Sequence, residues 1–200
     1  NYPMQILARV AGAALAMGNT LVVKPAEDAS LTAIRIGELA REAGFPDGVF
    51  NVVTGTGAVA GAALSGHPRV DYVTFTGSPP TGTAIQTAAA RNKRGVTMEL
   101  GGESPQIVFA DADIDAALPV LVNAILQNGG QTCSAGSRVL IEKPLFERVA
   151  AGLAERFSAL VAAPHDADRD LGALINARQR GRVAAMVSEA EAAGAPVLAR

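Results

Sequence analysis

The sequence predicts an α/β fold built on parallel β-sheet. Short apolar runs of strand length alternate with longer stretches of helical periodicity along the first hundred residues, which is the pattern of βαβ units. Continuous apolar runs such as residues 21–23 are typical of strands covered on both faces. Hydrophobic residues make up 49% of the 200 residues, enough to bury a core, and the absence of Trp makes that core aliphatic.

The first hundred residues supply four helices and four strands. Gly18 ends a first helix, Ser30 caps a second, and the Gly-Phe-Pro segment at 44–46 ends that second helix. Helices are expected at 4–17, 30–43, 58–65 and 81–91, and strands at 20–24, 49–53, 70–75 and 96–100.

Polar and glycine residues follow the ends of these strands. Ligands of parallel sheets bind beyond the carboxyl ends of the strands, so this placement predicts a binding site. The residues at these ends are Lys24, Gly55, Gly57, Gly77, Ser78 and Glu99.

The pattern changes near Gly101 and Gly102, where we expect a domain boundary. Beyond it the sequence predicts strands at 106–109 and 137–141. Asp111 or Asp113 caps a long helix that runs to about residue 128. Further helices are expected at 145–161 and 176–193, with a polar loop at 165–168 between them.

Charge and composition exclude several classes of protein. The net charge of −2 and the absence of a basic cluster argue against nucleic-acid binding. The sequence contains no uncharged apolar run of eighteen or more residues, so no membrane span is expected. The first residues lack a signal-peptide pattern. We therefore expect a cytoplasmic location and no membrane partner. The chain also lacks an initiator Met and stops inside a helix-to-strand pattern, which favours a fragment of a longer chain.

The cysteine content limits the chemistry further. A single cysteine excludes an internal disulfide framework and fits a reducing compartment. The two histidines, His67 and His165, lie in polar turns without paired ligand spacing, so no metal site is predicted. Neither histidine has a glycine-rich or strand-end setting, which disfavours a Cys-His hydrolase pair.

Cys133 lies among small residues in the segment 129–138, where a substrate could approach its sulfur closely. A thiol becomes a strong nucleophile when its thiolate is favoured or a base stands nearby. Glu99 lies in an apolar, glycine-flanked segment, where burial would raise the pKa of its carboxyl towards that of a general base. A buried core cysteine and a surface acid remain the alternative interpretation.

Two further patterns suggest nucleotide binding. The segment 77–82 follows a strand and opens a helix, as a phosphate-binding turn does, although it matches neither GxGxxG nor Walker A. Lys24 and Glu27 follow another strand, where a carboxylate can accept ribose hydroxyls and repel a 2′-phosphate. An ordinary turn and a solvated ion pair are the respective alternatives.

Taken together, the motifs resemble, in order and in spacing, the NAD(P)-dependent aldehyde dehydrogenase superfamily. The resemblance covers essentially all of the chain and is carried by residues 1–3, 18–27, 42–46, 75–78, 98–102 and 130–138. It implies a Rossmann-like parallel-sheet NAD(P)-binding domain over 1–100, incomplete at its N-terminus. Part of an α/β catalytic domain would follow over 101–200, incomplete at its C-terminus.

The resemblance also implies roles for individual residues. Cys133 matches the nucleophile, Glu99 the general base, and Asn1 the amide that binds the oxyanion together with the Cys133 backbone N–H. The expected cofactor is NAD, with NADP left open, and its contacts would come from Lys24, Glu27, Gly57, Gly77, Ser78 and Leu100.

The implied activity is oxidation of a small-molecule aldehyde to a carboxylic acid through a cysteine thiohemiacetal and a thioester. The full-length protein is expected to be a homodimer or homotetramer, and the 200-residue piece alone is expected to be inactive. A CoA-acylating aldehyde dehydrogenase and an inactive nucleotide-binding fragment of the same fold stay open as alternatives.

The chain departs from the family pattern at Val10, at Glu103 and at Pro79-Pro80, which stiffens the expected phosphate turn. Val10 stands where many relatives carry Lys, which removes a charge from the first helix. Glu103 stands where Lys or Asn is common, and we interpret it as a surface change.

Overall fold

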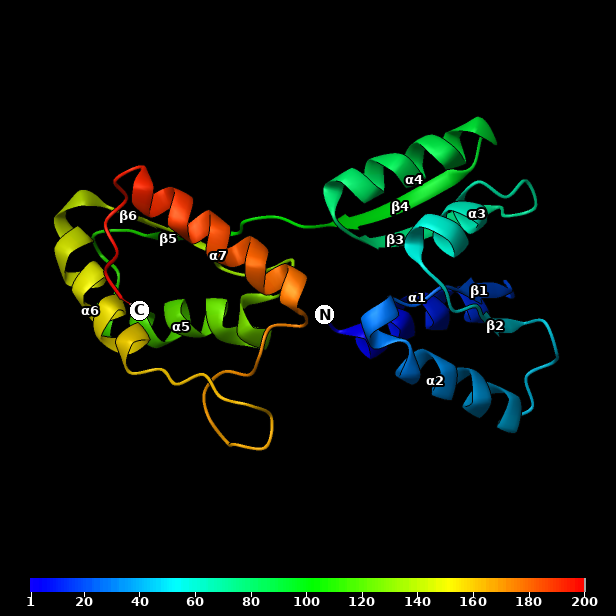
Figure 1. The fold of residues 1–200 in the computed structure, drawn as a ribbon, viewed down its shortest axis with the longest axis horizontal. Helices are drawn as coiled ribbons and strands as arrows, with labels where there is room; N and C mark the ends of the chain where they lie inside the picture. The colour runs from blue at the N-terminus through cyan, green and yellow to red at the C-terminus, as the bar shows by residue number, and fades with distance from the viewer. Residues whose placement is uncertain (200) are drawn as a thin grey trace. The chain divides into compact units, whose positions relative to one another are not determined.

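Every strand pairs in parallel with one other strand. In the computed structural model, which describes residues 1–199, six strands form three two-stranded parallel sheets (Figure 1). The chain divides into two units, Asn1–Leu100 and Gly101–Arg200; the first holds two of the sheets and the second holds the third. Parallel pairs with helices between them in sequence confirm the predicted α/β class.

The first unit alternates helices and strands as predicted. A 3₁₀ turn at Glu27–Ala29 was not predicted, and the helix predicted at 58–65 begins as a π-helical turn at Gly57–Gly61 before it becomes α-helical. The regular elements are α1 Pro3–Ala16, β1 Leu21–Val23, α2 Leu31–Glu42, β2 Phe50–Val52, α3 Ala62–Ser65, β3 Tyr72–Gly77, α4 Pro79–Arg91 and β4 Gly95–Leu100.

The β1–β2 sheet runs in register from Leu21 opposite Phe50 to Val23 opposite Val52. Helix α2 packs closely on it, because a Cβ on Gly37 would lie 3.1 Å from Val52 Cγ2. Val22 points away and is 46% exposed. This second face is covered only in part, because Val22 lines a cavity together with Ala63 and Leu64 of α3, so the expectation that both faces are covered holds only in part. No ladder joins this sheet to β3–β4 among the described residues.

Helix α4 covers the β3–β4 sheet and begins earlier than predicted. Pro79 lies in its first turn, where the fixed φ of proline suits a helix and its missing N–H costs no hydrogen bond. Gly82, which lies in the predicted helix 81–91 and ends the segment 77–82, is a buried residue of this helix. A Cβ there would lie 2.7 Å from Leu100 Cδ2, so glycine lets the helix approach β4.

Ser30 does not cap α2 with its side chain, contrary to the prediction. Its backbone is already helical, with φ −83° and ψ −29°, and its hydroxyl accepts no capping hydrogen bond. The 3₁₀ turn at Glu27–Ala29 leads directly into the helix, so the chain never takes the extended conformation from which a serine caps.

The second unit has one sheet and three helices among its described residues. Helices α5 and α6 pack against one another and against the sheet through a core of Val108, Ile114, Leu118, Leu121 and Val149 (Figure 1). Asp113, one of the two predicted caps, accepts hydrogen bonds from the backbone N–H groups of Asp115 and Ala116. The elements are β5 Pro105–Val108, α5 Ile114–Leu126, β6 Arg138–Ile141, α6 Phe146–Ser158 and α7 Ala177–Ala192.

Helix α5 ends two residues before the predicted position. Asn128, Gly129 and Gly130 have φ of 53°, 62° and 74°, a left-handed conformation that breaks the helical hydrogen-bond pattern. Asn128 Nδ2 also donates to the Gln131 carbonyl oxygen at 3.0 Å, which tightens this turn. The turn redirects the chain from α5 into the segment that carries Cys133.

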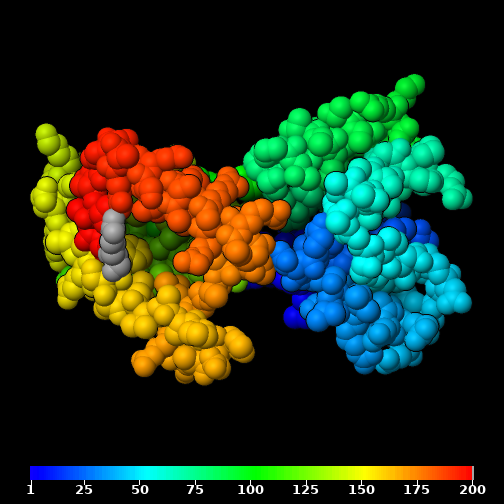
Figure 2. Space-filling model, viewed as in Figure 1, coloured from blue at the N-terminus to red at the C-terminus, as the bar shows by residue number. Residues whose placement is uncertain are grey.

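Helix α7 lies on the surface of the second unit, coloured orange to red in Figure 2. No residue of this helix is buried, and its apolar side chains Val183, Met186 and Val187 are 39%, 58% and 50% exposed. None of the helices formed by residues 1–199 is long and apolar enough to cross a membrane.

Candidate functional site

Three predicted cofactor residues form one hydrogen-bonded cluster in the first unit. Lys24 directly follows β1, and its Nζ donates to the Gly55 carbonyl oxygen at 3.2 Å and to Glu27 Oε2 at 3.5 Å. Glu27 Oε1 accepts the Gly57 backbone N–H at 2.7 Å. The loops after β1 and β2 are thus tied together at the carboxyl ends of both strands. We call Lys24, Glu27, Gly55 and Gly57 the β1–β2 cluster.

The β1–β2 cluster keeps its carboxylate charged and accessible. Hydrogen bonds from the backbone N–H groups of Glu27 itself and of Gly57 hold the pKa of the Glu27 carboxyl below its usual range; burial opposes this, and the charge of Lys24 adds to it. Half of the Glu27 side chain is exposed, whereas Lys24 is largely buried. A hydroxyl-bearing ligand would therefore meet the carboxylate before it meets the ammonium group.

Three other predicted residues meet at the carboxyl end of the β3–β4 sheet. Gly77 and Leu100 are register partners at the last position of the two strands. Ser78 follows Gly77 and precedes α4, and its hydroxyl hydrogen-bonds the Thr81 hydroxyl at 2.9 Å. A helix N-terminus beside strand ends is an environment that suits an anion.

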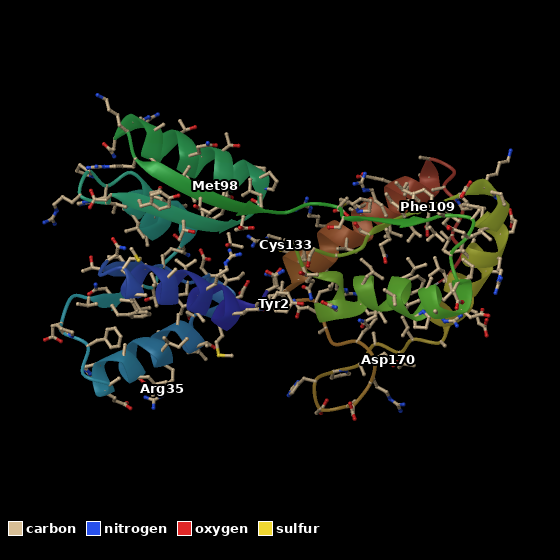
Figure 3. All side chains as sticks on the ribbon, turned by 180° about the vertical axis from the view of Figure 1, so that it is seen from behind. Tyr2, Arg35, Met98, Phe109, Cys133 and Asp170 are labelled. Carbon is tan, nitrogen blue, oxygen red and sulfur yellow. The ribbon has the colours of Figure 1, made fainter. Side chains whose placement is uncertain are left out.

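Glu99 lies next to this edge, one residue before Leu100 and immediately after Met98, which is labelled in Figure 3. Its side chain is 45% exposed, and Oε1 lies 3.5 Å from Arg9 Nη2 of α1. The expectation of a buried Glu99 carboxylate is therefore wrong. Its setting is an ion pair with a residue ninety positions away, which the apolar sequence around Glu99 did not indicate.

Asn1 is exposed and lies two residues before the first residue of α1. Tyr2 follows it with a left-handed backbone, φ 43° and ψ 44°, and Pro3 begins the helix. Asn1, Arg9 and Glu99 all belong to the first unit, whereas Cys133 belongs to the second.

Cys133, labelled in Figure 3, is exposed. The interpretation of this residue as a buried core cysteine is therefore wrong. Its turn is closed by a hydrogen bond from the Ala135 N–H to the Thr132 carbonyl oxygen at 3.2 Å. Ala135, two residues further on, is only 5% exposed, so an accessible thiol is attached to a buried backbone.

The segment 102–104 packs along this turn within the second unit. A Cβ on Gly102 would lie 3.9 Å from the Cys133 carbonyl oxygen, and the Ser104 N–H donates to the Ala135 carbonyl oxygen at 3.2 Å. Glu103 accepts a hydrogen bond from the Ser137 hydroxyl through Oε2. Its side chain is at the surface, as expected, but it also attaches this segment to the residues after the cysteine.

Several contacting residues were not singled out from the sequence. Arg9 pairs with Glu99, and Gln131 joins two loops by donating to the Asn128 carbonyl oxygen and accepting from the Ile175 N–H. Gln106 Nε2 donates to the carbonyl oxygen of Gly136, three residues after Cys133. A polar side chain at the start of an otherwise apolar strand was the only sequence signal for Gln106.

The model of the aldehyde dehydrogenase family matches residues 1–200. Hydroxyisobutyraldehyde dehydrogenase of Mycolicibacterium austroafricanum is 46% identical over 184 residues, which is 92% of this chain and 36% of that protein. Betaine aldehyde dehydrogenase 2 of Rhizobium meliloti is 45% identical over 196 residues, which is 98% of this chain and 40% of that protein. The chain thus spans about two fifths of the length of these relatives.

Solved structures agree with the sequence matches. A Burkholderia cenocepacia protein assigned as an aldehyde dehydrogenase superposes with a TM-score of 0.96 at 60% identity, covering 99% of this chain and 42% of that one. Betaine aldehyde dehydrogenase of Staphylococcus aureus, in complex with NAD⁺, gives a TM-score of 0.94 at 38% identity, covering 97% and 39%. These matches confirm the resemblance found in the sequence: the chain belongs to the aldehyde dehydrogenase family.

Proposed function

We propose that the chain is the central part of an enzyme that oxidises a small-molecule aldehyde to a carboxylic acid with NAD. The observation that carries the proposal is the exposed thiol of Cys133 on a turn anchored by buried backbone, in a chain matched throughout by the family.

The residues of the β1–β2 cluster fit the adenosine part of NAD. Glu27 presents carboxylate oxygens that can accept the ribose hydroxyls, and Lys24 offers an ammonium group beside them. The nearest contact of a Cβ on Gly57 would be Glu27 Oε1 at 3.9 Å, so a flat group can approach this backbone. The N-terminus of α4, after Gly77 and Ser78, suits a pyrophosphate.

Cys133 would begin the reaction as a thiolate. Its sulfur forms a bond to the carbonyl carbon, and the carbonyl oxygen becomes an oxyanion that accepts hydrogen bonds from the Asn1 amide and the Cys133 backbone N–H. NAD, when bound, supplies the acceptor for the hydride that leaves this carbon. Loss of that hydride converts the thiohemiacetal on Cys133 into a thioester.

Glu99 would then accept a proton from water, and the hydroxide attacks the thioester carbon. The carbon–sulfur bond breaks, which releases the carboxylic acid and restores the Cys133 thiolate. The net reaction consumes one aldehyde, one NAD⁺ and one water. It yields one carboxylic acid, one NADH and one proton.

The decisive experiment uses the full-length protein with Cys133→Ser. Turnover should fall to a few per cent of the wild-type value or below, because a serine alkoxide is far less available than a thiolate, while NAD binding persists. Adding CoA to the wild-type assay separates the CoA-acylating alternative, in which the product would be an acyl-CoA. NAD binding without turnover in the wild-type protein would instead indicate an inactive nucleotide-binding protein.

The full-length protein is further proposed to be a cytoplasmic homodimer or homotetramer without nucleic-acid or membrane partners. The single cysteine of this chain fits a reducing compartment, and its net charge of −2 disfavours nucleic acid as a partner. The oligomeric state is proposed from the resemblance to the family alone. Cell fractionation and light scattering of the full-length protein would test it.

A further inference from the structure

The turn that carries Cys133 passes from exposed to buried within two residues. Cys133 and Ser134 are exposed, whereas Ala135 and Gly136 are buried. The Ala135 N–H closes the turn on the Thr132 carbonyl oxygen. The positions of the thiol and of the Cys133 backbone N–H therefore depend on how the Ala135–Gly136 backbone is held.

Gly136 is held from two sides. Its N–H donates to the Ala124 carbonyl oxygen of α5 at 3.1 Å, and its carbonyl oxygen accepts from Gln106 Nε2 of β5 at 2.9 Å. A Cβ at this position would lie 2.6 Å from Gln106 Nε2 and 3.0 Å from Ala124 Cβ. A side chain does not fit unless the Gln106 amide moves.

The Gln106 amide also reaches α5, because Nε2 donates to the Leu121 carbonyl oxygen at 3.3 Å. Both partners of this nitrogen are carbonyl oxygens, so the amide group must face them with its NH₂. One half-buried side chain thus joins β5, α5 and the turn after Cys133. Replacing it with an apolar residue would leave two carbonyl oxygens without this donor.

We propose that Gln106 is a positioning residue for the Cys133 turn, acting through the Gly136 carbonyl oxygen. This inference rests on the proposed function, in which Cys133 is the nucleophile. It adds that the positions of the thiol and of the adjacent backbone N–H donor depend on a side chain outside the proposed catalytic and cofactor-binding residues. A small displacement of a reacting group lowers the rate strongly without preventing cofactor binding.

The test compares Gln106→Leu with Val108→Ala in the full-length protein. Val108 is 4% exposed, lies two residues further along β5 on the same face, and belongs to the core. Val108→Ala should therefore lower Tm without displacing the turn. Gln106→Leu should lower kcat about tenfold or more, with KM for NAD within about twofold of the wild-type value.

A second readout needs no aldehyde oxidation. Alkylation of Cys133 by iodoacetamide, followed by peptide mass mapping, should slow about fivefold or more in Gln106→Leu and stay near the wild-type rate in Val108→Ala. Equal alkylation rates and kcat in Gln106→Leu and wild type would overturn the proposal. Equal slowing in both variants would also overturn it, since the effect would then be general destabilisation.

Gly136→Ala decides the question if Gln106→Leu does not fold, because it displaces the Gln106 amide from the opposite side. It should slow alkylation and kcat in the same way, and adding Gln106→Ala to Gly136→Ala should slow them little further, because both changes disrupt the same hydrogen bond. Failure of the proposed function can be distinguished from failure of the positioning role. Full turnover in Cys133→Ser would refute the nucleophile, whereas an unchanged Cys133 alkylation rate in Gln106→Leu and Gly136→Ala refutes only the positioning role.

Discussion

Arg9 Nη2 of α1 lies 3.5 Å from Glu99 Oε1 of β4. The pair connects the helix that begins beside Asn1 with the strand that carries the proposed base. Arg9 is adjacent to Val10, where the resemblance led us to expect a lysine, so α1 carries a cation one position before the expected place. Both side chains are about half exposed, so the contact contributes little to the stability of the fold, and we expect its main effect to be on the orientation of Glu99.

Arg9→Met should change the free energy of unfolding by less than about 1 kcal/mol, because exposed ion pairs contribute little. It should nevertheless slow the steady-state rate by about threefold or more while the first turnover stays fast, because Glu99 acts only when the thioester is hydrolysed. Stopped-flow measurement of the NADH burst separates the two phases. Arg9→Lys should restore most of the rate, and a slowed burst with unchanged steady-state rate would contradict the role.

Glu27→Gln should shift the cofactor preference towards NADP. The carboxylate suits a free 2′-hydroxyl and repels a phosphate, and its removal leaves Lys24 as the only charged side chain of the β1–β2 cluster. We expect the ratio of kcat/KM for NAD over NADP to exceed one in the wild type and to fall about tenfold in the variant. Glu38→Gln, which removes the same charge from α2, should leave the ratio unchanged. A wild type that uses NADP at least as well as NAD would refute the assignment.

The pH dependence of stability should report the same carboxylate. The pKa of Glu27 is lowered in the folded state from a reference value of 4.5, so its stabilisation is present above pH 4.5 and is lost as the pH falls through the folded value. At pH 7 the wild type should therefore have a higher Tm than Glu27→Gln, and the two Tm values should converge as the pH is lowered. A difference in Tm that grows as the pH is lowered would contradict this prediction.

Gly82→Ala should raise KM for NAD, because the new Cβ would lie 2.7 Å from Leu100 Cδ2 and must push that side chain aside. Gly12→Ala is the matched control: it lies inside α1, and a Cβ there meets no described atom within 4 Å. The control should gain up to about 1 kcal/mol of stability from helix propensity. Gly82→Ala should gain less and raise KM for NAD by about threefold or more. Equal gains and an unchanged KM would show that Leu100 moves freely and lies away from the cofactor.

Local sequence patterns predicted the features that depend on neighbouring residues. The small residues around Cys133 indicated an accessible thiol, and the glycines and polar residues after each strand indicated the strand ends where Lys24, Gly57 and Ser78 lie. The Asp113 cap was likewise predictable, because a cap is satisfied by the next three residues.

Features that depend on distant parts of the chain were predicted poorly. The apolar sequence around Glu99 suggested burial, but its environment includes Arg9, which no local pattern connects to it. Ser30 had the right residue type for a cap, and the preceding 3₁₀ turn removed the required backbone conformation. Division of the first unit into two sheets depends on strand pairing, which periodicity does not determine.

Strand β4 places Glu99 and Leu100 on opposite faces, because successive side chains of a strand alternate. Glu99 turns towards Arg9 of α1, and Leu100 packs on Gly82 of α4. Proposed proton transfer and proposed cofactor contact are therefore kept apart by the thickness of one strand. Inserting or deleting a single residue in Gly95–Leu100 would exchange the two faces, whereas many substitutions would preserve them. The length of this strand should therefore vary less in evolution than its composition.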